Sequence, residues 1–382
     1  MTEDRRPLRS HILSVIDLFA GAGGLSLGAT RAGFSLTAAV ELDNRAMDTH
    51  ARNFPDAVHL QEDVGSLTGD GLLAKCGLSR GEAIGLMGGP PCQGFSAMGR
   101  RSEHDPRNDM FGHFMRLVAE IRPAFFLAEN VPGILNAKYE AVVSAALHKV
   151  PRHYSVLRPF LVRASDFGAP TSRKRVIFFG YDPQRMAEIQ LQNFESAKTL
   201  DAVNVRTALH GLPVDIPEHW IDDASSWRSI SVTKTGAFFD RVTGLIPSGV
   251  GDQFALEWYA RSRKVHGNFG TRHSAPLVAR YDVLKFGQTD AVSKARRLDP
   301  NGFCPTLRAG TGPDKGSHQA VRPIHYLRPR VITPREAARL QGFPDWFRFD
   351  STKWHSFRQI GNSVSPIMAE SLLCAVRCAV RR

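Results

Sequence analysis

The sequence predicts an α/β protein with a second, smaller and irregular domain. Up to about residue 182, apolar runs that read as strands alternate with helical segments, the pattern of a sheet covered by helices. After that point the alternation is lost, and short runs separated by Gly, Pro and Ser continue to about Pro329. We therefore expect a first domain over 11–182, a second over 183–354, and a C-terminal segment, 355–382, that returns to the first domain.

The first expected unit is a strand, a tight turn and a helix. Residues 15–19 are apolar except for Asp17, residues 20–24 are Ala and Gly, and a helix is expected from Leu25 to about Gly33. A second strand over 38–43 ends in acidic residues. Glycines allow a ligand to approach the first turn, and an acid on the second strand can accept hydrogen bonds from ribose. The glycines lack the usual dinucleotide-binding register, so an ordinary α/β turn stays open.

Three further strands are expected to end at the same edge. Residues 58–64 end at Glu62 and Asp63, residues 84–87 lead to Cys92, and residues 124–128 lead to Glu129. Ligands of open α/β sheets bind beyond the carboxyl ends of the strands, so these polar groups are expected to converge. Viewed alone, Glu129 has a helix-capping or surface acid as the alternative interpretation.

Cys92 follows two prolines and precedes a glycine-rich loop. Pro90 and Pro91 each fix φ near −65°, so the backbone entering Cys92 is stiff. Gly88, Gly89 and Gly94 have no Cβ, so they leave room for a ligand at the backbone on either side. This arrangement suits a nucleophile that must be aimed, although a buried and inert thiol in a turn is the alternative.

Basic residues mark two further places. Arg173 and Arg175 are two apart, so on a strand they share one face and could recognise an anion or a carbonyl. The chain has a net charge of +12, and residues 261–330 contain 14 Lys and Arg against 4 Asp and Glu. Such a segment indicates a polyanionic partner, with nucleic acid first, while a solvated basic face is the alternative.

The cysteines indicate neither a metal site nor a disulfide framework, and the apolar runs indicate neither a signal peptide nor a membrane span. None of the five cysteines forms a Cys-x-x-Cys or zinc-finger spacing, so no metal site is expected. Cys374 and Cys378, four apart on an expected C-terminal helix, are interpreted as core packing. An odd number of cysteines without a framework favours a reducing, cytoplasmic setting. No signal peptide and no membrane span are expected.

Seven sequence blocks in order resemble the bacterial-type DNA (cytosine-5)-methyltransferase family. They are residues 17–24, 41–43, 88–96, 129–131, 173–175, 335–344 and 359–364. The family usually has Gln two residues before the first arginine of the fifth block, where this chain has Thr171. The resemblance implies a Rossmann-like S-adenosyl-L-methionine-dependent catalytic domain and a target-recognition domain. It also implies double-stranded DNA as partner, a monomer on DNA, a nucleoid-associated location and a cognate restriction endonuclease encoded nearby.

The resemblance also implies the roles of individual residues. Cys92 would add to carbon 6 of a flipped-out cytosine, Glu129 would hold ring nitrogen 3 and the amino group, and Arg175, with Arg173, would hold oxygen 2. Cofactor binding would fall to Asp17, Phe19, Ala20, Gly21, Gly23, Gly24, Glu41, Leu42, Asp63, Val64, Pro91, Asn362 and Ser363, and DNA binding to Ser96, Arg100, Arg101, Arg308 and Lys315.

The chemistry agrees with these roles. Adding a thiolate to carbon 6 breaks the aromaticity of the ring and makes carbon 5 nucleophilic. A thiol with a pKa near ~8.5 needs nearby positive charge, such as Arg175, to ionise at neutral pH. A carboxyl group such as Glu129, if its pKa is raised, could protonate ring nitrogen 3. Three alternatives stay open: a tRNA methyltransferase of the same family, a DNA-binding regulator that keeps the fold, and a zinc-dependent enzyme.

Overall fold

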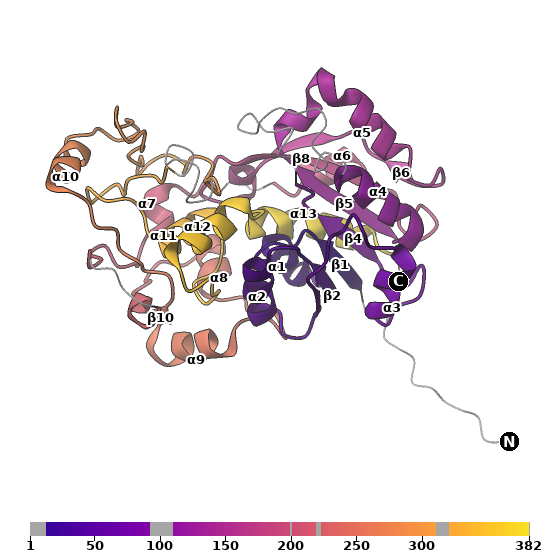
Figure 1. Cartoon of the computed structure of the whole chain (residues 1–382), viewed down its shortest axis with the longest axis horizontal. Helices are drawn as coiled ribbons and strands as arrows, with labels where there is room; N and C mark the ends of the chain where they lie inside the picture. The colour runs from indigo at the N-terminus through magenta and orange to yellow at the C-terminus, as the bar shows by residue number, and fades with distance from the viewer. Residues whose placement is uncertain (1–12, 92–109, 199–200, 219–222, 311–320, 382) are drawn as a thin grey trace.

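A single large sheet forms the centre of the protein (Figure 1). The computed structural model describes residues 13–91, 110–198, 201–218, 223–310 and 321–381. Within these residues the sheet has eight strands. They are β1 (Ser14–Leu18), β2 (Ser35–Val40), β3 (Val58–Leu60), β4 (Gly85–Gly88), β5 (Phe125–Asn130), β6 (Ser155–Val156), β7 (Phe160–Arg163) and β8 (Lys174–Tyr181).

The strand order confirms an α/β sheet of the doubly wound kind. The order is β3-β2-β1-β4-β5-β8-β6, with β7 also paired to β8. Strands β1 to β5 are parallel, whereas β8 runs antiparallel to β5. The carboxyl ends of β1, β2, β4 and β5 therefore meet at one edge. Strand β3 stops at Leu60, so the predicted strand over 58–64 is shorter than expected and its acids lie in the loop that follows.

Helices cover both faces of the sheet (Figure 1). Along β5 the side chains alternate: Phe125 and Leu127 pack into one core, and Phe126 and Ala128 into the other. The first core holds α1 (Gly24–Arg31) and α13 (Pro366–Ala379), and the second holds α3 (Gly69–Lys75), α4 (Met110–Ile121) and α5 (Glu140–Leu147).

The C-terminal helix α13 lies directly against α1. The contact depends on Gly28, because a Cβ atom there would lie 2.3 Å from Ala369 Cβ and 2.7 Å from the Glu370 nitrogen. Cys374 and Cys378 lie on the opposite, exposed side of α13. The interpretation that these two cysteines pack in the core is therefore wrong.

The region after β8 consists of short helices and one small sheet, as the loss of alternation predicts. Its apolar residues, including Val205, Phe239 and Val265, belong to the same core as α1 and α13. The elements are α6 (Leu191–Glu195), α7 (Val205–Ala208), β9 (Arg228–Ser229), α8 (Ala237–Thr243), α9 (Gln253–Ser262), β10 (Lys264–Val265) and α10 (Ala275–Asp282).

Helical order returns with α11 (Pro334–Gln341), as predicted. Thr333 accepts from the Glu336 nitrogen and the Glu336 side chain accepts from the Thr333 nitrogen, which closes a capping box with Pro334 at the first helical position. Arg335 is buried, and it donates to the carbonyl oxygens of His266, Pro344 and Phe347. Helices α2 (Asn44–Asn53) and α12 (Lys353–Asn362) complete this side of the protein. Among the described helices, none is long and apolar enough to cross a membrane.

Candidate active site

A cavity of about 670 Å³ opens at the carboxyl edge of the sheet. Four predicted groups converge on it: the turn after β1, the acid after β2, the segment entering Cys92, and the acid at the end of β5. Residues from β8 and α12 complete its wall. The predicted site residues among its lining are Asp17, Phe19, Ala20, Gly21, Gly24, Glu41, Leu42, Asp63, Val64, Pro91, Glu129, Arg173, Arg175, Asn362 and Ser363.

The turn after β1 is shaped by three residues with positive φ, Phe19, Gly21 and Gly23. Phe19 has φ of 58° and Gly21 has φ of 56°, and no atom lies within 4 Å of the position that a Cβ on Gly21 would take. Glu41 fastens this turn to β2, since its carboxylate accepts from the Gly21 nitrogen at 2.9 Å and from the Asp43 nitrogen at 2.8 Å. Burial raises the pKa of Glu41, and these two backbone bonds oppose that rise.

The other two glycines of the turn serve packing. A Cβ on Gly24 would lie 2.2 Å from the Val364 carbonyl oxygen, so only glycine lets α1 approach the segment after α12. A Cβ on Gly23 would lie 2.4 Å from the Phe54 ring, and Gly23 does not line the cavity. The expectation that every glycine of this turn gives a ligand access to the backbone therefore applies to Gly21 and not to Gly23.

Asp17 is the more deeply buried of the two buried acids of this site, the other being Glu129. Its side chain is 1 % exposed, and its Oδ2 accepts a 2.6 Å hydrogen bond from Ser26. Its Oδ1 is buried without a hydrogen-bond partner. Burial raises the pKa of Asp17 from 3.8 to about 7; the Ser26 hydrogen bond opposes this shift and the negative charge of Glu41 adds to it. A buried, unpartnered carboxylate oxygen beside a second acid is suited to a cationic ligand.

The outer part of the cavity combines an apolar wall with polar ends. Leu42 is 64 % exposed, which is unusual for a large aliphatic side chain, and it lines the cavity together with Phe19 and Val64. Asp63 and Asn362 are exposed on the same lining. An ion pair at this rim, in which Arg358 Nη1 lies 2.8 Å from Asp43 Oδ2, was not predicted from the sequence.

Glu129 and Arg175 form an ion pair in the inner part of the cavity. The pair joins Glu129 Oε1 to Arg175 Nε, and each residue is 8 % exposed. Strands β5 and β8 hold the two side chains, because their antiparallel register places Glu129 opposite Ile177 and brings Arg175 nearby. A buried carboxylate and guanidinium side by side offer both an acceptor and a donor to a polar ring.

Asn130 is a site residue to which sequence reasoning assigned no role. Its side-chain nitrogen donates to the Pro90 carbonyl oxygen at 3.3 Å, and its oxygen accepts from the Val131 nitrogen at 2.9 Å. This amide therefore ties the end of β5 to the backbone that leads into Cys92. Its place directly after Glu129 in a matched block was the available signal.

Arg173 lines the cavity, but its guanidinium is bonded within the protein. It precedes β8, is 2 % exposed, and donates to the carbonyl oxygens of Leu307 at 3.2 Å and Gly361 at 2.9 Å. The expected recognition of a carbonyl is thus satisfied within the chain. Thr171, which replaces the family's usual Gln, donates to the Cys304 carbonyl oxygen at 3.1 Å. Both residues join the first region to the segment around Cys304 and Leu307.

Several predicted residues lie outside the described residues: Cys92, Ser96, Arg100, Arg101 and Lys315. Arg308 is described, is exposed, and lies beside the cavity wall, because a Cβ on Gly361 would be 2.5 Å from its backbone carbon. Some of the basic side chains of residues 261–330 make their contacts within the protein. Arg297 donates to four carbonyl oxygens of residues 281–326, and Arg330 pairs with Glu336.

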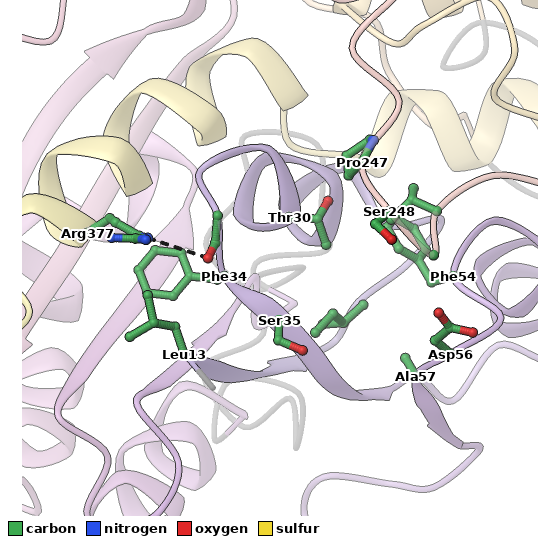
Figure 2. A pocket seen from close by; sticks show the side chains of 14 residues that line it. Leu13, Thr30, Phe34, Ser35, Phe54, Asp56, Ala57, Pro247, Ser248 and Arg377 are labelled. Atoms are coloured by element: carbon green, nitrogen blue, oxygen red, sulfur yellow. Dashed lines mark hydrogen bonds between the residues drawn. The ribbon is translucent and has the colours of Figure 1, made fainter. Parts of the chain in front are cut away.

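A second cavity, of about 460 Å³, lies at the amino ends of β1 and β2 (Figure 2). Figure 2 shows Arg377 reaching in from α13, with Pro247 and Ser248 lining another side. None of the predicted site residues lines it. The described part of the chain contains no group of three or more His, Cys, Asp or Glu residues that could hold a metal ion.

Comparison with known proteins agrees with this geometry. The family described as C-5 cytosine-specific DNA methylase matches residues 13–377. The type II methyltransferase M.XorII of Xanthomonas oryzae is 36% identical over 96% of this chain and 85% of its own length, and M.DdeI of Desulfomicrobium norvegicum is 30% identical over 94% and 87%.

Solved structures give the same result. A crystal structure of a candidate DNA modification methyltransferase encoded within an E. coli prophage is 48% identical, with a TM-score of 0.86 over 95% of this chain and 98% of that one. The Dnmt2 methyltransferase of S. pombe shares the fold, with a TM-score of 0.60 at 16% identity over 95% of this chain and 97% of that one. The chain therefore belongs to the C-5 cytosine-specific DNA methylase family.

Proposed function

We propose that this protein transfers a methyl group from S-adenosyl-L-methionine to carbon 5 of a cytosine in duplex DNA. The observation that carries the proposal is the buried Glu129–Arg175 pair at the inner end of the cavity, next to a Pro90–Pro91 segment that Asn130 holds in place. A binding protein that merely kept the fold would need neither this pair nor Cys92.

The residues after β1 and β2 suit the cofactor. Bound S-adenosyl-L-methionine supplies an electrophilic methyl group on a positively charged sulfur, and its amino acid part carries an ammonium group. The unpartnered Oδ1 of Asp17 and the nearby Glu41 offer negative charge to such a ligand. The open space at Gly21 lets the ligand approach the backbone, and Phe19, Leu42 and Val64 offer an apolar wall for its base.

The inner residues suit the cytosine. In this proposal the Cys92 thiolate adds to carbon 6, and Glu129 binds ring nitrogen 3 and the exocyclic amino group while Arg175 donates to oxygen 2. Carbon 5 then takes the methyl group. Loss of the carbon 5 proton and expulsion of the Cys92 thiolate restore the aromatic ring. Arg173 acts on this step only by holding β8 against the segments at Leu307 and Gly361.

The target base must leave the duplex, because carbon 6 is not accessible inside a stack. Flipping costs a few kcal/mol, about what contacts to the DNA backbone can offset. We propose that Arg100, Arg101, Arg308 and Lys315 supply such contacts. The type II names of M.XorII and M.DdeI support a further proposal, that methylation by this chain protects DNA from a partner restriction endonuclease.

A transfer assay with labelled cofactor tests the activity. The full chain is incubated with duplex DNA or with tRNA, and label is counted in each nucleic acid. We expect label in DNA and its loss in Cys92→Ala, which should still bind DNA. Label in tRNA alone would assign the RNA-acting branch of the family, and full activity of Cys92→Ala would overturn the covalent mechanism.

A further inference from the structure

A chain of hydrogen bonds runs from Asp17 to the edge of the sheet. Ser26 Oγ lies 2.6 Å from Asp17 Oδ2 and 3.0 Å from His50 Nε2, and His50 Nδ1 lies 3.0 Å from His59 Nε2. The four side chains come from β1, α1, α2 and the edge strand β3. Asp17, Ser26 and His50 are at most 1 % exposed, whereas His59 is only half-buried.

These hydrogen bonds can point in two directions. The Ser26 hydroxyl has one proton, so it can donate either to Asp17 or to His50, but not to both. In one direction a protonated Asp17 donates to Ser26, Ser26 donates to His50 Nε2, and His50 Nδ1 donates to His59. In the other direction His59 Nε2 donates to His50 Nδ1, His50 Nε2 donates to Ser26, and Ser26 donates to an ionised Asp17.

One proton shift along each hydrogen bond converts the first arrangement into the second. The O–H bond of Asp17 breaks, Ser26 and His50 each gain one proton and lose one, and an N–H bond forms at His59 Nε2. The number of protons is unchanged, so Asp17 becomes negative and His59 positive. Burial lowers the pKa of His59, and a hydrogen bond with the Ala57 backbone only partly opposes this, so His59 returns the proton to water through its exposed part.

Binding of a cation in the cavity favours ionisation of Asp17, which stands at the cavity end of this series of hydrogen bonds. Asp17 lines the cavity with an unpartnered Oδ1, and Glu41 is the charged group that acts on it. Without a cation in the cavity, two neighbouring carboxylates repel each other and burial favours a neutral Asp17. A cation placed between them favours the ionised form. Asp17 then has to lose a proton, and the hydrogen bonds through Ser26 and His50 connect it with the half-buried His59. The ring centroid of His50 lies 4.5 Å from that of Phe54.

We propose that Ser26, His50 and His59 are positioning residues that reverse their hydrogen bonds and carry the proton of Asp17 to His59 when the cationic cofactor binds. This inference rests on the proposed function, because it takes S-adenosyl-L-methionine as the cation. It assigns to the cofactor site two histidines that lie outside the cavity lining.

Nitrogen-15 NMR of the histidine-labelled full chain tests the reversal. The shift of each ring nitrogen reports whether it carries a proton, and His59→Gln and His50→Phe assign the two rings among the 14 histidines. On adding S-adenosyl-L-methionine at about pH 7, we expect Nε2 of both rings to change from unprotonated to protonated. The other histidines serve as internal controls.

Two variants separate a proton path from simple packing. In Ser26→Ala the hydrogen-bond link to Asp17 is cut, so adding cofactor should not change the protonation of either histidine ring. In His50→Phe, adding cofactor should not change the protonation of His59. Calorimetry establishes that each variant still binds cofactor. Unchanged rings in the cofactor-bound parent chain, or the same His59 response in either variant, would overturn the inference alone. Failure of the parent chain to bind cofactor would instead overturn the proposed function.

Discussion

Replacing Asp17 by Asn should make the stability of the protein less sensitive to pH. The two side chains have nearly the same shape, and an Asn oxygen can still accept from Ser26. What changes is the buried ionisable group. Because burial raises the pKa of Asp17 from 3.8 to about 7, the folded chain holds this proton more tightly than the unfolded chain does.

The sign and size follow from the two pKa values. An acid whose pKa is raised on folding contributes stability that is present below its unfolded pKa and is lost as the pH rises through its folded pKa. At about 1.4 kcal/mol per unit, the whole effect is about 4 kcal/mol, of which about 2.6 kcal/mol falls between about pH 5 and about pH 8. The Asn variant lacks this loss. Between about pH 5 and about pH 8, its free energy of unfolding should therefore rise by about 2.6 kcal/mol relative to that of the parent chain.

Urea unfolding, followed by circular dichroism at both pH values, measures this difference. Asp48→Asn, which removes an exposed carboxylate from α2, controls for the change in net charge. A difference between the Asp17→Asn variant and the parent chain that stays the same at about pH 5 and about pH 8 would refute the assignment of a raised pKa to Asp17.

Three further changes probe other parts of the account. Glu129→Gln should lower turnover by at least about 100-fold with normal cofactor binding, because it removes the carboxylate that holds ring nitrogen 3 and the amino group; steady-state kinetics and calorimetry check this, and an unchanged rate would remove Glu129 from the chemistry. Gly28→Ala should destabilise the chain by about 1–3 kcal/mol in urea unfolding, because the new methyl group would lie 2.3 Å from Ala369 Cβ, while unaltered stability would mean that α13 does not pack there. Arg308→Ala with Lys315→Ala should weaken DNA binding and reduce its slope against log salt by about 2, measured by fluorescence anisotropy; an unaltered slope would show that these two side chains do not contact the DNA.

The parts of the fold that are set locally could be predicted from the sequence. The apolar runs at β1, β2, β4 and β5, the Gly-rich turn after β1 and the capping box at Thr333 each depend on neighbouring residues, and each is present. The edge at which the strand ends meet follows from parallel pairing, so the convergence of Asp17, Glu41 and Glu129 was also predictable.

Contacts between distant residues could not be predicted in this way. The sequence places Arg173 and Arg175 on one face, but only the folded chain shows that Arg173 is held by the carbonyl oxygens of Leu307 and Gly361. The spacing of Cys374 and Cys378 fixes that they share a side of a helix, while the packing of α13 on α1 decides that this side is exposed. Nothing local connects Ser26 with His50 and His59.

In the proposed function, this chain methylates carbon 5 of cytosine in DNA with the residues around Glu129 and Cys92. Bisulfite sequencing of DNA from cells that express the chain tests it most directly, with cells that express Glu129→Gln as the matched control. We expect protected cytosines in one recurring sequence context with the parent chain and almost none with the variant. Unprotected cytosines throughout the DNA of cells that contain folded parent chain, or equal protection with the variant, would contradict the account.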